Sequence, residues 1–218
     1  GEGVRHLATL PQLKFLQLNY NRQIGDDAMR HLAGHRSLKS LLVTDTAVTD
    51  EGVRCLESTR LHRLELANNP QLTRDCMHSL SKMTTLHELN LSASAVVDDQ
   101  HLDDLAPLQG LSTLCVNSAS VTDESIDTLI QLRCLRRLEV RSTQLSEAGI
   151  ARLRENMPQC VIVHDAGTIA PTGTQFDRKV AEWAVDLGGQ VNLALAGQIH
   201  VVRETRSIPD AAFMVVYL

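Results

Sequence analysis

The pattern L-x-x-L-x-(L/V) occurs six times at a nearly constant spacing, and this repetition restricts the possible folds more than any other feature. The first leucines of the six patterns are 25, 23, 25, 25 and 24 residues apart. A period of about 20–50 residues is typical of solenoid proteins, because each unit buries its apolar face against the next unit. The six patterns are Leu13/Leu16/Leu18, Leu38/Leu41/Val43, Leu61/Leu64/Leu66, Leu86/Leu89/Leu91, Leu111/Leu114/Val116 and Leu135/Leu138/Val140.

The second half of each unit has its own regular pattern. An aliphatic residue is followed by others five and eight positions later, and the last two share one face of a helix. Thr49, Thr122 and Asp98 stand where helix N-caps are expected. The six triplets are Ile24/Met29/Leu32, Val48/Val53/Leu56, Leu72/Met77/Leu80, Val97/Leu102/Leu105, Val121/Ile126/Leu129 and Leu145/Ile150/Leu153.

Together the two halves predict the fold class. Each unit is expected to form a short strand, a turn, a short helix and a return loop. The leucines of the strand and the helix triplet point toward each other and form the core. Stacked units give an α/β solenoid with parallel strands on the concave side and helices outside.

The units resemble the leucine-rich repeat family. The segments AVTDEGVRCLESTRLHRLELANN and SVTDESIDTLIQLRCLRRLEV are similar to the V-T-D-x-G-L repeats of long bacterial proteins and to the cysteine-containing repeats of F-box proteins. The resemblance covers about residues 1–165. The family's asparagine after the strand is present at Asn21 and Asn69, and the other units have Thr46, Ser94, Ala119 and Thr143. Threonine or serine can still bond the turn backbone, whereas the turn at Ala119 needs another partner.

Three regions are expected along the chain. Residues 1–165 form the array of six to seven repeats, which opens inside a helix because GEGVRHLATLPQL matches DEGVRCLESTRL. Preceding repeats are therefore expected in a longer protein. A degenerate last strand contains Cys160, Val161 and Val163, and residues 166–175 read as a linker by composition.

Residues 176–218 are predicted as a small α+β unit. A helix carries Phe176, Val180, Trp183, Ala184 and Leu187 on one face, and a hairpin follows around Ala196-Gly197. IPDAAFMVVYL resembles the entry to another repeat strand. The unit resembles the N-terminal cap of a second repeat block, and the alternative is a C-terminal cap on the first array.

The sequence offers no pattern for catalysis, a cofactor or a metal. No GxGxxG, Walker A, GxSxG or HExxH motif occurs. His31 and His35 fall at a helix end and its loop, and the cluster DDQHLDD (98–104) reads as an N-cap with an acidic surface. The five cysteines form no CxxC pair, and their pattern fits free thiols in a reducing compartment such as the cytoplasm. A signal peptide in a longer protein stays open.

Charge and hydropathy restrict the partners. The net charge of -5 argues against a nucleic-acid partner, which requires a basic face. No stretch of about 18 apolar residues exists, so no membrane insertion is expected.

Residues between the inward leucines of the strands are expected on the concave face, in three columns. The first is Phe15, Ser40, Arg63, Glu88, Thr113 and Arg137; the second is Gln17, Leu42, Glu65, Asn90, Cys115 and Glu139; the third is Asn19, Thr44, Ala67, Ser92, Asn117 and Arg141. Cys115 is expected to be the most reactive thiol, because its column faces the concave solvent. The candidate partner-binding residues are Phe15, Tyr20, Leu42, Arg63 and Glu65 in one cluster and Arg137, Glu139 and Arg141 in another.

These observations favour a non-catalytic module that presents its concave sheet to a protein partner. Two alternatives remain: a structural spacer, which the small concave residues Ala67 and Ser92 would suit, and a regulatory segment of a larger enzyme. The identity of the partner and the oligomeric state are left open by the sequence.

Overall fold

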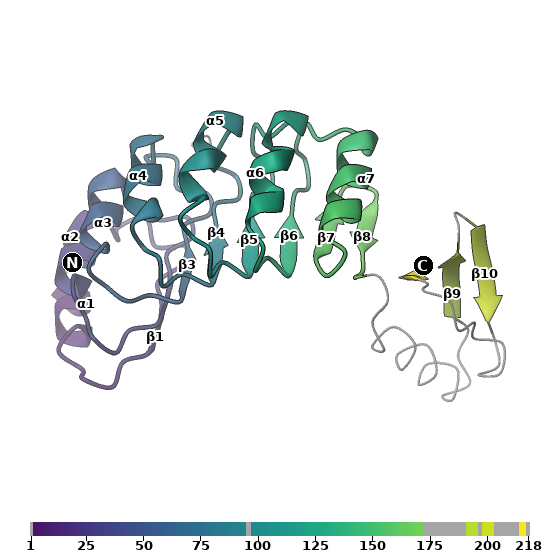
Figure 1. The fold of residues 1–218 in the computed structure, drawn as a ribbon. Helices are drawn as coiled ribbons and strands as arrows, with labels where there is room; N and C mark the ends of the chain where they lie inside the picture. The colour runs from purple at the N-terminus through teal and green to yellow at the C-terminus, as the bar shows by residue number, and fades with distance from the viewer. Residues whose placement is uncertain (1, 95–96, 172–190, 196–197, 203–213, 217–218) are drawn as a thin grey trace.

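The structure is a computed structural model of the 218-residue chain, and it describes residues 2–94, 97–171, 191–195, 198–202 and 214–216. Helices line one side of the array and short strands line the other (Figure 1). The repeat strands are β1 (Phe15–Gln17), β2 (Ser40–Leu42), β3 (Arg63–Glu65), β4 (Glu88–Asn90), β5 (Thr113–Cys115), β6 (Arg137–Glu139) and β7 (Val161–His164). The helices are α1 (Glu2–Leu7), α2 (Asp26–Leu32), α3 (Asp50–Cys55), α4 (Asp75–Ser81), α5 (Asp99–Leu102), α6 (Ile126–Gln131) and α7 (Glu147–Asn156), with 3-10 turns η1 (Asp103–Leu105) and η2 (Asp123–Ser125).

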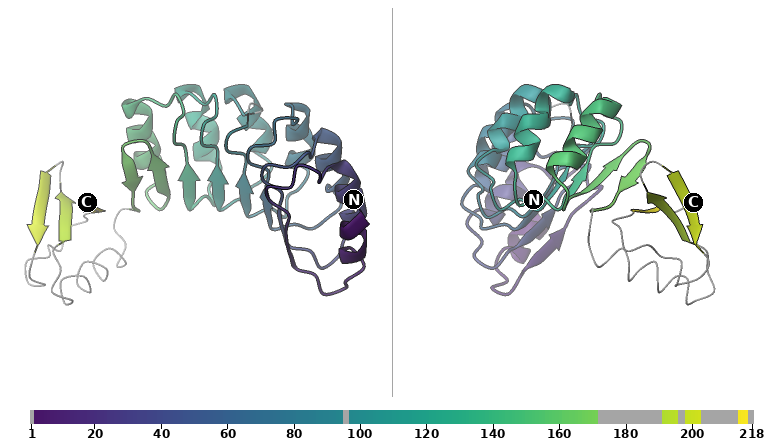
Figure 2. Two further views of the ribbon diagram at one scale, coloured as in Figure 1. Left: turned by 180° about the vertical axis from the view of Figure 1, so that it is seen from behind. Right: turned by 45° about the vertical axis from the view of Figure 1, so that its right-hand side comes forward.

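The strands β1 to β7 and a further strand, β8 (Gly167–Ile169), form one sheet in chain order, and the pairs from β1 to β7 are parallel. The register aligns the middle leucines, so that Leu16, Leu41 and Leu64 lie side by side and the series continues along the sheet. The curved row of repeats is seen from two further directions in Figure 2. The predicted solenoid is therefore confirmed, because each predicted strand lies beside its neighbours in the repeat register.

The core consists mainly of aliphatic side chains from the two repeated patterns. The inward leucines from β2 to β6 and most of the helix triplets are almost fully buried. Leu41, Leu64 and Leu114, for example, are each 0% exposed. Each such side chain contributes about 1.5–3 kcal/mol on burial, so stacking of repeats supplies the main stabilisation of the array.

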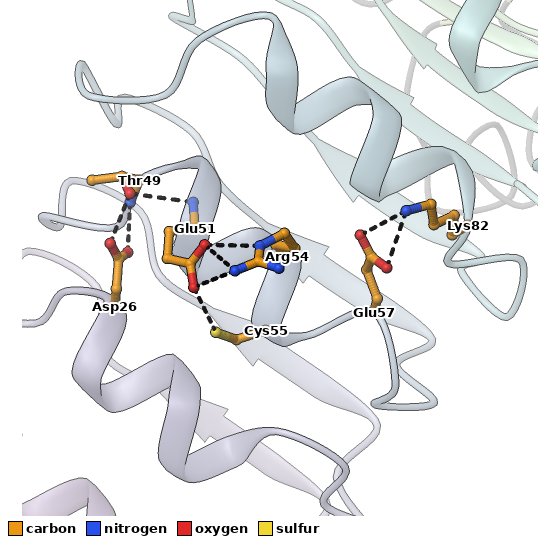
Figure 3. Close-up of polar contacts among 7 residues, drawn as sticks. All are labelled: Asp26, Thr49, Glu51, Arg54, Cys55, Glu57 and Lys82. Atoms are coloured by element: carbon orange, nitrogen blue, oxygen red, sulfur yellow. Dashed lines mark hydrogen bonds and ion pairs between the residues drawn. The ribbon is translucent and has the colours of Figure 1, made fainter.

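The helices begin at the predicted caps, and the caps also connect neighbouring repeats. The Thr49 hydroxyl accepts a hydrogen bond from the Glu51 N–H at 3.3 Å, and Asp98 caps the His101 N–H at 3.1 Å. Thr49 in turn donates from its N–H and its hydroxyl to the two carboxylate oxygens of Asp26, at 2.9 and 2.7 Å (Figure 3). One carboxylate therefore joins the start of one helix to the start of the next.

The same carboxylate connection recurs at three other junctions. Asp50 accepts from Thr73, Asp99 from Thr122, and Asp123 from Ser146, each through both oxygens. We call this series the aspartate ladder. The ladder explains the V-T-D part of the repeat. The threonine caps its own helix, and the carboxylate of the aspartate accepts hydrogen bonds from the threonine or serine of the following repeat.

The glycine of the V-T-D-x-G motif makes room for the ladder. A Cβ at Gly52 would clash with the Asp26 Oδ1 atom, and a Cβ at Gly149 would clash with the Asp123 Oδ1 atom. Both contacts are far shorter than van der Waals distances. A side chain at either glycine would therefore displace the carboxylate that connects the two repeats.

One junction reverses the roles of donor and acceptor. Arg74 occupies the position of the ladder aspartate, and the next cap is Asp98 instead of threonine. The Arg74 Nη2 and Asp98 Oδ2 atoms form an ion pair at 2.9 Å. Asp98, Asp99 and Asp103 all have hydrogen-bond partners on neighbouring backbone or side chains, so the DDQHLDD cluster has the structural role that the sequence indicated.

The turn after β3 depends on a buried asparagine. Asn69 accepts from the N–H and hydroxyl of Thr46 and donates to the carbonyls of Val43 and Leu66. We expected serine to replace asparagine in this role, but the buried Ser94 hydroxyl has no hydrogen-bond partner among the described residues. The physical reason lies in the next repeat. Asn69 supplies an acceptor for the hydroxyl of Thr46, whereas the equivalent residue in the repeat after Ser94 is Ala119, whose side chain has no acceptor.

The end of the array differs from the predicted linker. β8 (Gly167–Ile169) lies antiparallel to β7, so residues 167–169 of the expected linker 166–175 form a hairpin with the last repeat strand. Gly167 has a φ of 138°, a backbone conformation that favours glycine, and it follows the turn directly. Residues 172–175 and the predicted helix at 176–187 lie outside the described residues.

A second, three-stranded sheet contains β9 (Val191–Leu195), β10 (Gln198–Val202) and β11 (Met214–Val216). β9 and β10 pair antiparallel with Gln198 opposite Leu195, which confirms the predicted hairpin. β11 also pairs antiparallel with β9 and does not continue the parallel repeat sheet as a repeat strand would. Among the described residues, no helix is long and apolar enough to cross a membrane.

Candidate functional site

The concave face carries the predicted columns in register. In the first column, Ser40, Arg63 and Glu88 are direct neighbours on adjacent strands. In the second, Asn90, Cys115 and Glu139 are neighbours in the same way. Because adjacent strands lie about 4.8 Å apart, side chains of one column contact each other. The structure therefore confirms which residues face one another across the sheet.

The first repeat exposes two aromatic side chains. Phe15 is 52% and Tyr20 is 75% exposed, and with Leu10 they are the exposed large apolar residues in the described part of the chain. Tyr20 has a φ of 62° at a turn position that Asp45, Asn68, Ala93, Ser118 and Ser142 occupy in the other repeats. A bulky residue is costly in this left-handed conformation. The backbone conformation at this turn position therefore does not explain why the first repeat has a tyrosine there.

Leu42 does not belong to the exposed cluster that we predicted. Only 6% of it is exposed, although it lies outside the main core cluster. Its column neighbours are the long side chains of Gln17 and Glu65. On a concave surface, neighbouring side chains converge and leave little open area above a residue between them. Leu42 is therefore part of the packed floor of the sheet.

Arg63 lies at the centre of a group of charges. Its Nη2 atom is 2.5 Å from the Glu65 Oε1 atom, and its Nε atom is 3.3 Å from the Glu88 Oε2 atom. The lateral pair with Glu88 is the one that the columns indicated. The hydrogen bond to Glu65 raises the pKa of Arg63, so the guanidinium keeps its charge.

Arg137 and Glu139 repeat the same arrangement three strands away. The Arg137 Nη2 atom is 2.6 Å from the Glu139 Oε1 atom. The Asn117 amide also donates to the Glu139 Oε2 atom, at 3.1 Å. Burial alone would raise the pKa of Glu139, but the hydrogen bonds from Asn117 and Arg137 lower it overall. Arg141 is exposed and contributes to that lowering through its charge.

A hollow of about 370 Å³ joins these two charged groups. The Arg63–Glu65 pair lies at one end and the Arg137–Glu139 pair at the other. The sequence assigned the two pairs to separate clusters, and the structure places them around one depression. The residues between them, none of which we had counted among the partner-binding residues, are Glu88, Asn90, Thr113 and Cys115. We call this depression the concave hollow.

Cys115 lies in this hollow but does not have the reactivity that we expected. Burial raises its pKa to about 12, and the charge of Glu139 acts in the same direction. At neutral pH the thiol is therefore protonated, and the thiolate is the reactive form. All five cysteines are free, and Cys134 is the exposed one among them.

Another hollow, of about 490 Å³, lies at the last repeat between α7 and the β7–β8 hairpin. Leu145, Ile150 and Ile169 are among its lining residues. Within the array, each repeat covers the apolar end of the repeat before it. An apolar surface at the last repeat is therefore the end of the repeat core. The concave hollow is therefore the better candidate for a specific site.

Comparisons with known proteins identify the repeat architecture. A family model described as "Leucine Rich repeat" matches residues 34–56, which contain β2 and α3. An internalin (inlF) from Listeria monocytogenes has a TM-score of 0.54 at 21% identity, over 74% of this chain and 50% of that one. The matched segment is thus similar to a leucine-rich repeat, and the array has the fold of leucine-rich repeat proteins. Internalin C2 from the same organism has a TM-score of 0.51 at 20% identity, over 69% of this chain and 70% of that one.

At these sequence identities, the likeness to the internalins shows the fold of this chain and leaves its partner open. The chain spans half the length of the first internalin. No curated protein sequence matches it. The columns of the concave face therefore have to be interpreted from their own chemistry.

Metal ligation has no support in the described part of the leucine-rich repeat array, where no group of three or more His, Cys, Asp or Glu side chains could hold an ion. His35, which the sequence placed near His31, accepts a hydrogen bond through its Nδ1 atom from the Leu38 N–H at 3.1 Å. This contact gives His35 a structural role in its loop.

Proposed function

We propose that this leucine-rich repeat array is a non-catalytic module that binds a protein partner through its concave face. The observation that carries the proposal is the concave hollow, in which two Arg–Glu pairs stand on rigid strands at opposite ends. Such paired charges are already oriented before a partner arrives, so less side-chain entropy is lost on binding. The hollow is therefore suited to select a partner by the pattern of its charges.

The exposed aromatics of the first repeat extend this surface. Phe15 lies in the same column as Arg63, two strands away, with Ser40 between them. Aromatic residues are frequent anchors at protein interfaces, because they bury a large area at low cost in conformational entropy. A partner that spans Phe15, Arg63 and Arg137 would contact five strand spacings, or about 24 Å of the sheet.

The test begins with a partner that the chain captures from its source and that is then purified. Binding of this partner is measured by calorimetry for the unchanged protein, for Tyr20→Ala and for Arg137→Ala. Removal of an interface anchor is expected to cost about 1–3 kcal/mol, or about 5- to 150-fold in Kd. Arg154→Ala serves as the control, because Arg154 is exposed on α7, away from the concave sheet.

Two results would contradict the proposal. Unchanged affinity in all concave variants would place the partner elsewhere. If no protein binds the chain in this experiment, the alternative of a structural spacer is favoured. Melting curves accompany each variant, since exposed substitutions are expected to change stability by less than about 0.5 kcal/mol.

A further inference from the structure

The edge of the sheet at which the strands begin has a charge pattern of its own. The loops that lead from helix to strand contain one acidic residue, Glu57, and its carboxylate is 3.2 Å from the Lys82 ammonium. The same loops contain many basic residues and histidines. These loops are residues 8–14, 33–39, 56–62, 82–87, 106–112, 132–136 and 157–160.

The residues directly before the strands β1 to β6 form a further column, which we call the basic edge. Its members are Lys14, Lys39, His62, His87, Ser112 and Arg136. Backbone hydrogen bonds connect each member to the next: the Lys39 N–H donates to the Lys14 carbonyl at 2.8 Å, and the series continues to Arg136 at 2.7–2.8 Å. The members are therefore spaced by one strand, about 4.8 Å.

The two histidines lie at the centre of the basic edge. Their ring centroids are 5.1 Å apart, and both residues are exposed. Partial burial and the charges of Lys39 and His87 lower the pKa of His62. The other charged groups next to the histidines in the chain are Arg63 and Glu88, which pair with each other at 3.3 Å. In the described structure, no carboxylate pairs with Lys14, Lys39 or Arg136.

Helix dipoles explain the charged residues at the opposite edge, where the helices begin, but not the charged residues of the basic edge. Acidic residues occupy the first turns of α2 to α5, of η2 and of α7, where the helix N-terminus favours negative charge. The basic edge is not on helices. Its residues stand several positions after each helix has ended, beyond the last turn in which the dipole acts. Lys39 donates to the Arg60 carbonyl at 3.3 Å and Arg136 to the Leu135 carbonyl at 3.2 Å, but in the described structure no carboxylate neutralises their charges.

We propose that the basic edge binds an acidic, extended segment of a protein partner, and that protonation of His62 and His87 strengthens this binding. The inference rests on the proposed protein-binding function and names the chemistry of one part of the partner. From Lys14 to Arg136 the edge spans five strand spacings, about 24 Å, which about seven extended residues match in length. Exposed carboxylates along such a segment complement the cations of the edge.

The experiment uses the complete 218-residue chain and a fluorescein-labelled octaglutamate peptide. Fluorescence anisotropy gives the Kd at low salt, at about pH 7.5 and about pH 5.5, between which histidine gains its charge and glutamate stays ionised. We expect about three- to tenfold tighter binding at the lower pH, from two further exposed charge pairs. An octaglutamine peptide is expected not to bind.

Substitutions separate the two parts of the proposal. Lys39→Gln and Arg136→Gln are each expected to weaken octaglutamate binding by about two- to fivefold at both pH values. The double variant His62→Gln, His87→Gln is expected to remove the pH dependence and to keep the binding at pH 7.5. Arg154→Gln changes the charge equally on the outer surface and is expected to have no effect.

Three outcomes would overturn the proposal. The first is octaglutamate binding that Lys39→Gln and Arg136→Gln leave unchanged. The second is binding that Arg137→Ala abolishes and the edge variants do not, which would assign the carboxylates to the concave hollow. The third is binding of a heparin octasaccharide without any binding of octaglutamate. Failure of the proposed function has a different signature, because it requires unchanged partner affinity in the concave variants.

Discussion

Asn69 is the residue for which the structure gives the sharpest prediction of stability. It is 1% exposed, and its side chain connects two repeats through the turn after β3. Its Oδ1 atom accepts from the Thr46 N–H at 2.8 Å, and its Nδ2 atom donates to the Val43 carbonyl at 2.8 Å and to the Leu66 carbonyl at 2.9 Å. Asn69→Ala would leave the Thr46 N–H and the Leu66 carbonyl buried without a partner, and the Val43 carbonyl would keep only the hydrogen bond from the Thr46 hydroxyl, at 2.9 Å.

The expected cost follows from the number of orphaned groups. A buried polar group that loses its partner costs about 1–3 kcal/mol, and partial relaxation of the turn reduces the sum. We therefore expect Asn69→Ala to lower the free energy of unfolding by about 3–5 kcal/mol. For a chain of this size that loss corresponds to a fall in Tm of about 6–20 °C.

Asn21 provides a matched control. It occupies the same repeat position, but it is exposed, and it donates only to the carbonyls of Leu18 and Asn19. Water can replace these bonds, so Asn21→Ala is expected to cost less than about 1 kcal/mol. Ala119→Asn is the converse test, because it would offer the Ser94 hydroxyl an acceptor and is expected to raise stability by about 1 kcal/mol.

Urea unfolding monitored by circular dichroism measures all three variants. The slope of the transition is compared with that of the unchanged chain, so that a loss of two-state behaviour is recognised. Equal effects of Asn69→Ala and Asn21→Ala would refute the reasoning, because burial of the orphaned groups would then not decide the cost.

Further predictions concern packing, titration and thiol chemistry. Gly149→Ala is expected to lower the Tm by displacing Asp123, whereas Gly110→Ala is expected to change it little, because the nearest atom to a Cβ there is 3.8 Å away. Leu42→Ala is expected to cost less than Leu41→Ala, for which about 2–5 kcal/mol is typical, since Leu42 lies outside the core cluster; equal melting curves would contradict this. Hydrogen bonds from Ser146 lower the pKa of Asp123. Their stabilisation is therefore present above the ordinary Asp pKa and lost as the pH falls through the folded pKa, and Ser146→Ala is expected to reduce this acid sensitivity in urea melts. Mass spectrometry after brief thiol labelling is expected to find Cys134 modified first, and faster labelling of Cys76, whose pKa burial raises to about 12, would contradict this order.

The repeat was predictable from the sequence because one physical requirement fixed many residues. Each strand must turn a leucine inward at the same height, so the pattern recurs at each unit and also sets the register. Leu16, Leu41 and Leu64 are direct neighbours for this reason. The exposure of residues outside this shared requirement was harder to predict. Leu42 was expected to be exposed because its position faces the concave side, but the packing of its neighbours buries it.

The aspartate ladder shows what a motif alone does not reveal. The sequence indicated that Thr49 and Thr122 cap helices, but it gave no reason for the aspartate that follows each of them. That reason lies in the adjacent repeat, where the next threonine or serine donates to the carboxylate. A signal was present: where Arg74 replaces the aspartate, Asp98 replaces the next threonine, and the two residues pair at 2.9 Å.

This exchange suggests how the surface of a solenoid is best interpreted. Residues at equivalent positions in successive repeats are spatial neighbours, so a column carries information that no segment of the chain carries. The concave columns predicted the pair between Arg63 and Glu88 in this way. The position before each strand lies outside the inward and concave positions of the repeat, so the repeat pattern does not reveal it as a column. Aligned through the backbone hydrogen bonds, the positions before β1 to β6 form a row of three cations, two histidines and one serine. Because no carboxylate in the described structure pairs with the three cations, this row is the kind of surface at which a function should be sought.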